Sequence, residues 1–261
     1  MKNWKKQKPT PVMEAPPEPP IKVAICIPCQ DKVEAKFAVA LADLVGMIVA
    51  QYCNQGIADL NIFTYNSSYI AWSRTEITKG ALAWGATHLL WLDSDMIFPG
   101  WTFHHLFKQD KPIIGANYAR RRDPHAPVTF KTIVPNGAED EHKLCYTEKD
   151  STGLEEVDAI GFGVVLVQAQ VFNEMKTAPF RVLDDEMSRL RVGEDVYFCQ
   201  LAKSVGLPIY IDHDLSQHVR HIGTQEFHNG HSVMAREIAK KAIVVMPTAE
   251  IVTPKIELVR S

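Results

Sequence analysis

Cysteine is scarce in this chain, and its distribution excludes a disulfide framework. The 261 residues contain five cysteines, an odd number, and most of them lie in apolar surroundings. Cys26 and Cys29 have the spacing of a redox pair. However, Cys26 falls inside a predicted strand and no second pair follows. A reduced protein without thiol redox chemistry is therefore expected.

The chain also lacks an excess of charge of one sign and any long apolar run. Its formal net charge is −3, which gives no support for general nucleic-acid binding. No apolar run approaches the roughly 18 residues of a membrane span, so no transmembrane segment is predicted. The basic start of the chain leads into prolines and is not typical of a signal peptide, so a cytoplasmic location is expected.

The order of the predicted elements indicates a single α/β domain. Short apolar runs that are typical of buried strands alternate with stretches of helical spacing, which predicts parallel strands joined by right-handed crossovers. The predicted strands are 22–27, 59–65, 88–92, 112–115 and 208–212, and the predicted helices are 33–54, 70–84, 101–108, 168–175 and 196–204, with a further helix beyond Thr224 that runs through Met234 to Lys241. Alternation at 128–133 suggests a smaller β-excursion. A flexible Pro- and Lys-rich leader is expected at 1–20 and a tail at 242–261.

Two carboxylates follow the apolar run at 88–92, in the sequence Asp93-Ser94-Asp95. A buried strand would deliver them to its carboxyl end, which is the edge where open α/β sheets bind ligands. Two hard oxygen donors at this spacing suit Mg²⁺ or Mn²⁺ that also holds phosphate oxygens. An isolated motif of this kind is more often an ordinary turn, but the preceding strand favours a metal site.

A second acidic pair, Glu194-Asp195, follows Gly193 at the start of a predicted helix. Carboxylates at a helix start are commonly caps, worth about 1 kcal/mol. The alternative is a general base beside the metal site, which would deprotonate an acceptor hydroxyl.

Histidines gather near the end of the chain, where five of the ten lie between His213 and His231. One of them could return to the carboxylates, and a nitrogen ligand favours an ion such as Mn²⁺ over Ca²⁺. His221 is the preferred candidate and His218 the second choice.

Basic side chains near the predicted strand ends could contact phosphates. Arg74, four residues into its helix, has the geometry to pair with a diphosphate, although a surface arginine is an equal alternative. The cluster Arg120-Arg121-Arg122 could hold substrate phosphates or an acidic acceptor, but a solvated loop is the more frequent outcome.

Together these motifs resemble glycosyltransferases of the GT-A fold, family 2 in particular, over residues 22–225. The matching pieces in chain order are Val23-Ala24-Ile25-Cys26-Ile27-Pro28, Trp72-Ser73-Arg74, Leu92-Asp93-Ser94-Asp95-Met96, Gly115-Ala116-Asn117-Tyr118, Gly161-Phe162-Gly163, Gly193-Glu194-Asp195 and His221-Ile222-Gly223. The resemblance implies a mostly parallel sheet with helices on both faces. It further implies one catalytic domain at 21–241, with a nucleotide-binding half at 21–116 and an acceptor half at 117–241.

The resemblance also implies roles for individual residues. Asp93, Asp95 and His221 would bind Mn²⁺ or Mg²⁺, and Asp195, with Glu194 beside it, would be the acceptor-side base if the enzyme inverts configuration. The residues implied to contact a UDP- or GDP-sugar donor are Pro28, in the loop after the first strand, Arg74, Asp93, Ser94, Gly161 and Gly163. Thr75 departs from the family, in which asparagine often follows the arginine.

The function expected from the sequence is therefore a metal-dependent glycosyltransferase with an unidentified acceptor. One alternative is a nucleotidyltransferase, but Pro28-Cys29-Gln30-Asp31 offers neither the glycine-rich loop nor the basic residue usual after the first strand of such enzymes. The other is a non-catalytic protein of the same fold that binds a nucleotide-sugar or a glycan.

Overall fold

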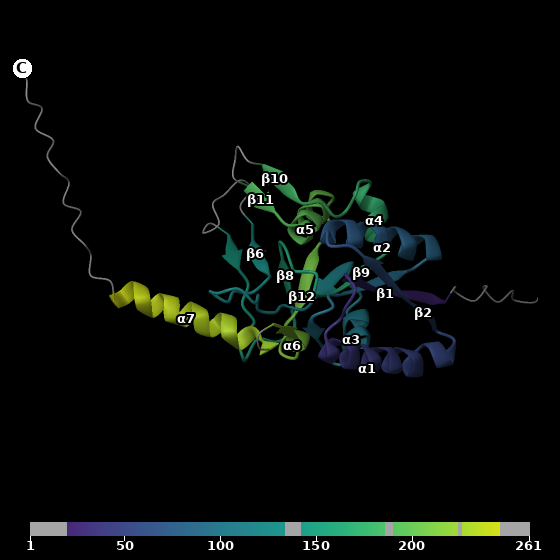
Figure 1. Cartoon of the computed structure of the whole chain (residues 1–261), viewed down its shortest axis with the longest axis horizontal. Coiled ribbons are helices and arrows are strands. Elements are labelled where there is room, and N and C mark those ends of the chain that lie inside the picture. The colour runs from purple at the N-terminus through teal and green to yellow at the C-terminus, as the bar shows by residue number, and fades with distance from the viewer. Residues whose placement is uncertain (1–19, 134–141, 186–189, 224–225, 246–261) are drawn as a thin grey trace, which may run out of the picture.

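The protein is built on a seven-stranded sheet with helices on both faces (Figure 1). The structure is a computed structural model that describes residues 20–133, 142–185, 190–223 and 226–245. The predicted leader, apart from Pro20, and the part of the predicted tail beyond Val245 lie outside the described residues.

Five of the seven strands run in the same direction, and the other two, β9 and β8, run against their neighbours. The order across the sheet is β2 (Ala58–Asn66), β1 (Ile21–Cys29), β3 (His88–Leu92), β9 (Val164–Gln168), β5 (Ile113–Gly115), β12 (Ile209–Asp212) and β8 (Leu154–Val157). The mostly parallel α/β sheet that the sequence predicts is confirmed. The sequence did not predict that β9 lies antiparallel between β3 and β5, because a continuous apolar run is compatible with either strand direction.

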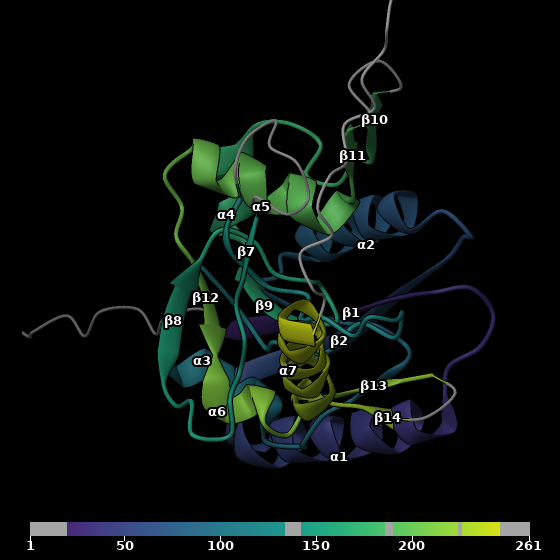
Figure 2. The same cartoon turned by 90° about the vertical axis from the view of Figure 1, so that its left-hand side faces the viewer.

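Helices cover the two faces of this sheet in separate layers, as Figures 1 and 2 show. On one face lie α1 (Ala35–Gln51) and α3 (Thr102–Lys108), and on the other lie α2 (Ile70–Trp84), α4 (Gln170–Met175) and α5 (Glu194–Ser204). The predicted helix at 70–84 and the predicted strand at 88–92 are confirmed at both ends.

Strand β3 contributes to both cores because successive side chains of a strand point to opposite faces. Leu89 and Trp91 pack with the helices of the α2 side, whereas Leu90 and Leu92 pack with those of the α1 side. All four side chains are fully buried, which explains why this run is continuously apolar rather than alternating. The strand thus anchors the loop that carries Asp93.

Helix α1 is unusually apolar. With the 3₁₀ turn at Cys53–Gln55 it spans Ala35–Gln55, and by length and composition alone it could cross a membrane, with a mean hydropathy of 1.5. Its buried side chains, including Phe37, Leu44 and Ile48, pack in the core beneath the sheet. Packing of these side chains against the sheet therefore explains why one side of this helix is apolar.

Three small sheets surround the main one. They are β4 (Met96–Ile97) with β13 (Arg220–Ile222) and β14 (Glu226–Phe227), β6 (Phe130–Thr132) with β7 (Lys143–Leu144), and β10 (Leu183–Asp185) with β11 (Leu190–Val192). Strand β6 is the predicted β-excursion. The short α6 (His213–Ser216) follows β12, and α7 (Asn229–Val245) projects from the body of the protein (Figure 1), continuing four residues past the expected domain boundary at 241.

Pro28 lies inside β1 and not in a loop after it, which corrects the expected end of that strand. Proline lacks the backbone N–H and usually interrupts a central strand. Beyond Cys26, however, the register of β1 continues only with β2, where Pro28 lies opposite Tyr65. With one side of the strand unpaired, the missing N–H is tolerated.

Candidate active site

The motif Asp93-Ser94-Asp95 forms the turn between β3 and β4. The amide of Asp93 donates to the carbonyl of Gly163 at 3.0 Å, and the amide of Met96 donates back to the carbonyl of Asp93 at 3.1 Å. The carbonyl of Ser94 accepts from the amide of Glu34, just before α1, at 3.1 Å. The turn at the carboxyl end of β3 is therefore held by the segment before β9 and by the residue before α1.

Arg74 lies beneath this turn, where its buried guanidinium joins two carboxylates. Its Nη2 is 2.9 Å from Oδ1 of Asp93, and its Nε is 3.3 Å from Oε1 of Glu194. The arginine side chain is 3% exposed, and its Nη1 has no hydrogen-bond partner among the described residues. Arg74 lies near the start of its helix, as predicted, and it contacts the motif. Its guanidinium does so from the interior of the protein and not from the surface.

The two aspartates of the motif differ in their electrostatic surroundings. Burial raises the pKa of Asp93 above its ordinary value, although Arg74 opposes the rise. Burial also acts on Asp95, but the hydrogen bond and charge of His221 and the charge of Arg121 outweigh it and lower the pKa. Asp95 is thus the carboxylate held most firmly in its charged form.

His221 reaches the motif because β13 pairs with β4, which places it opposite Met96. Its Nε2 is 3.5 Å from Oδ2 of Asp95. Its Nδ1 lies 3.3 Å from the carbonyl oxygen of Ala119, which can only accept, so Nδ1 carries the hydrogen. A protonated ring donates from Nε2 to Asp95, and a cation bound between the two side chains would take the place of that hydrogen. Such a pair of donors fits a shared cation.

The structure places His218 elsewhere, against the ring of Trp101 at 5.4 Å between centroids. Arg121, from the basic cluster, instead reaches the motif: its Nη1 is 3.1 Å from Oδ2 of Asp95 and 3.2 Å from the carbonyl oxygen of Ile222. Its side chain is 50% exposed. The run of arginines was noticed in the sequence, but nothing in it indicated that Arg121 contacts Asp95.

Glu194 and Asp195 begin α5 and have different partners. Glu194 forms an ion pair with Arg74, as described above, while Oδ1 of Asp195 accepts a hydrogen bond from the amide of Val196 at 2.7 Å. Burial, and then the charge of Glu194, raise the pKa of Asp195 to about 6. A carboxylate with this pKa is mostly ionised at neutral pH and yet basic enough to take a proton.

Gly161 and Gly163 pack around the hydroxyl of Tyr118, a residue whose part in the site the sequence did not reveal. The amide of Gly163 donates to this hydroxyl at 3.0 Å, and a Cβ at Gly163 would lie 2.5 Å from it. A Cβ at Gly161 would lie 2.8 Å from the same oxygen. Close packing by itself explains both glycines, and their expected contact with a donor sugar stays a prediction. The same holds for Pro28 and Ser94.

Two hollows among the described residues lie away from these carboxylates. One of about 650 Å³ lies beside Thr87 and His88, at the opposite end of β3, and one of about 590 Å³ lies against α7 beside Met234. The chemistry of the strand-end residues, and not the size of a hollow, therefore singles out the candidate site.

The fold is GT-A-like: a mostly parallel α/β sheet with helices on both faces and a carboxylate motif at the end of a central strand. No family model matches the chain, and no curated protein matches it.

Solved structures do resemble it. A197 from STIV is 15% identical, with 81% of this chain and 91% of that chain covered, at a TM-score of 0.51. GalNAc-T7, solved with UDP, GalNAc and Mn²⁺, is 10% identical, with 85% of this chain and 48% of that chain covered, at a TM-score of 0.45. At these identities the likeness to A197 supports the fold alone.

Proposed function

We propose that the protein is a metal-dependent glycosyltransferase that moves a sugar from a UDP- or GDP-sugar to an acceptor. The observation that carries the proposal is the meeting of Asp95 and His221, which are far apart in sequence but only 3.5 Å apart in space. They meet at the carboxyl end of β3, the edge at which α/β sheets of this kind bind ligands.

Asp95 and His221, with Asp93 beside them, are the residues that would hold Mn²⁺ or Mg²⁺. Carboxylate oxygens and one imidazole nitrogen suit these ions. When bound, such an ion would stabilise the negative charge that develops on a departing diphosphate. Arg74 holds Asp93 from the interior of the protein, so the outer side of the turn would face the ligand.

The remaining charged residues divide the other tasks. Glu194 balances the charge of Arg74, so Asp195 is the carboxylate left to accept a proton from the acceptor hydroxyl in an inverting transfer. Arg121 is half exposed and paired only at the surface of the site, so it can turn from Asp95 to a donor phosphate.

The direct test is Asp95→Asn, assayed with a panel of nucleotide-sugars in the presence of Mn²⁺, Mg²⁺ or a chelator. Donor cleavage should fall at least about 100-fold, because one preorganised electrostatic group is lost from the site. Binding of Mn²⁺, followed by electron paramagnetic resonance, should weaken in parallel. Asp150→Asn, at an exposed position, is the matched control and should change neither.

Full activity of Asp95→Asn, or cleavage that is indifferent to the chelator, would overturn the proposal. Saturable binding of a nucleotide-sugar without any turnover would instead identify a binding protein of this fold.

A further inference from the structure

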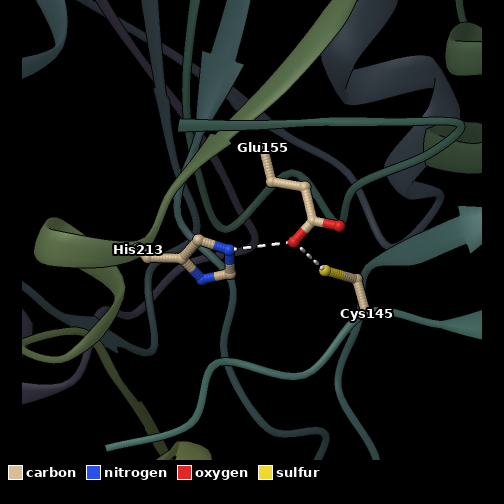
Figure 3. A group of neighbouring side chains, drawn as sticks. All are labelled: Cys145, Glu155 and His213. Atoms are coloured by element: carbon tan, nitrogen blue, oxygen red, sulfur yellow. Dashed lines mark hydrogen bonds and ion pairs between the residues drawn. The ribbon is translucent and has the colours of Figure 1, made fainter. Parts of the chain in front are cut away.

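A second group of potential metal ligands lies apart from the motif, where Cys145, Glu155 and His213 converge (Figure 3). Cys145 follows β7, Glu155 belongs to β8 at the edge of the main sheet, and His213 begins α6 directly after β12. Cys145 and His213 are buried, and Glu155 is partly exposed. None of the roles proposed above uses these three residues.

Two of the three distances between the ligand atoms match the edges of a tetrahedral zinc site. Oε2 of Glu155 is 3.4 Å from Sγ of Cys145 and 3.1 Å from Nε2 of His213, and all three atoms lie within 4.8 Å of one another. Typical zinc bonds of about 2.0 Å to oxygen or nitrogen and about 2.3 Å to sulfur imply tetrahedral edges of about 3.3–3.5 Å. The side chains therefore need only small movements to share one ion.

Neighbouring residues orient the histidine as they do in zinc proteins. Nδ1 of His213 is 3.0 Å from Oγ1 of Thr147, which also accepts from Nδ2 of Asn117 at 3.2 Å. With an ion bound, the ring would keep its hydrogen on Nδ1 for Thr147, and the lone pair of Nε2 would be directed at the ion. Nδ2 of Asn117 also donates to the backbone carbonyl of Cys145 at 2.9 Å, so one amide steadies two of the three segments.

The carboxylate of Glu155 is likewise placed for binding through one oxygen. Lys131 pairs with Oε1, the oxygen that does not face Cys145 and His213. A hydrogen bond to the outer oxygen is a usual support for a carboxylate that ligates through the inner one. The lysine is 59% exposed, so it can also turn into solvent and open a path to the group.

We propose that Cys145, Glu155 and His213 bind one Zn²⁺, with water as the fourth ligand. A thiolate, an imidazole and a carboxylate together favour zinc over Mg²⁺ or Mn²⁺, which separates this group from the strand-end carboxylates. On binding, the ion replaces the hydrogen atoms that Cys145 and His213 now present to Glu155. It would join the loop after β7 to the β8 edge of the sheet and to α6, and so stabilise the folded state.

The test is substitution with Co²⁺, which gives an intense thiolate-to-metal absorption band only when a cysteine ligates the ion. The full-length wild-type protein should show this band and, when loaded with zinc, hold one equivalent more than Cys145→Ser by elemental analysis and melt at a higher temperature. Cys145→Ser should lose the band and bind zinc at least about 100-fold more weakly. Cys53→Ser, a partly buried cysteine outside the group, is the matched control and should keep both.

Glu155→Gln provides a second variant that spares the buried side chains, in case Cys145→Ser fails to fold. It should keep a weak thiolate band and lose zinc affinity. Asp95→Asn should leave the band unchanged, which makes the outcome independent of the proposed transferase activity. Folded wild-type protein that shows no thiolate band with Co²⁺, or a band that survives in Cys145→Ser, would overturn the proposal and identify the three residues as a hydrogen-bonded structural group.

Discussion

The strand-end cluster (Arg74, Asp93, Asp95, Glu194, Asp195 and His221) and the Cys145 cluster (Cys145, Glu155 and His213) both gather acids and histidine, but they balance charge differently. The first has a buried arginine that serves Asp93 and Glu194 at once, whereas the second has the exposed Lys131 at its outer edge. The pKa values of one carboxylate from each cluster move in opposite directions: burial raises that of Asp195, while for Glu155 the hydrogen bonds from Lys131 and His213 outweigh burial and lower it. The permanent internal charge of Arg74 lets the first cluster keep Asp93, Glu194 and Asp195 close together.

The largest expected effect is therefore on stability when Arg74 is replaced. Arg74→Met would leave Asp93 and Glu194 without their buried partner, and removing one member of such a pair costs about 3–5 kcal/mol. Lys131→Met is the matched change in the other cluster and should cost much less, because its ion pair is exposed to solvent and screened. Urea denaturation of both variants in a chelating buffer measures the difference.

Arg74→Lys adds an intermediate point, since lysine keeps the charge but cannot hold two carboxylates with one planar group. Equal losses of stability for Arg74→Met and Lys131→Met would show that the contrast between the clusters is wrong.

The raised pKa of Asp195 gives the next effect, with a definite sign. The folded state holds this proton more tightly than the unfolded state, so the contribution of Asp195 to stability is lost as the pH rises from about 4 through about 6. A rise in the pKa of Asp195 from an ordinary value of 3.8 to about 6 corresponds to about 3 kcal/mol. Asp195→Asn should therefore unfold less readily than the wild type at neutral pH but be nearly equal to it below about pH 4.

Turnover should show the opposite dependence, because a general base must be ionised. Wild-type activity is expected to rise with pH and to reach half its plateau near pH 6. Asp195→Asn should lose this activity. Stability curves of the two proteins that run parallel over this pH range would contradict the assignment of this titration to Asp195.

The smallest effect concerns packing beneath the strand-end cluster. Gly163→Ala would press a methyl group against the hydroxyl of Tyr118 and should destabilise the fold by about 1–3 kcal/mol. Gly46→Ala, on an open part of α1 with nothing within 4 Å of its Cβ, should instead stabilise it by about 0.5–1 kcal/mol. Thermal melting of the two variants tests whether each change raises or lowers stability. Stabilisation by Gly163→Ala would show that the side chain of Tyr118 moves to make room for the methyl group.

Much of the fold could be predicted because local patterns were strong. The helix at 70–84 ends at Gly85, which adopts the left-handed conformation that glycine tolerates, and the strand at 88–92 is continuously apolar because both its faces are buried. The direction of β9 could not be predicted, since a buried apolar strand has the same residue pattern whether it runs parallel or antiparallel to its neighbours.

The candidate site divides in the same way. Asp93 and Asp95 were recognised from adjacent residues in the sequence, and Asp195 from a helix start. The partnership of Arg121 with Asp95 and the Cys145 cluster left no local signal, because their members come from separate loops and strands at irregular spacing.

The sequence by itself determined which segments become helices and strands and which of them end in carboxylates, because these follow from the periodicity of apolar residues and from neighbours along the chain. Only the tertiary structure decided that His221 lies against Asp95, that Arg74 faces inward, and that Cys145, Glu155 and His213 meet. These contacts depend on strand order and register, which arise when the whole hydrophobic core packs and not from any single segment.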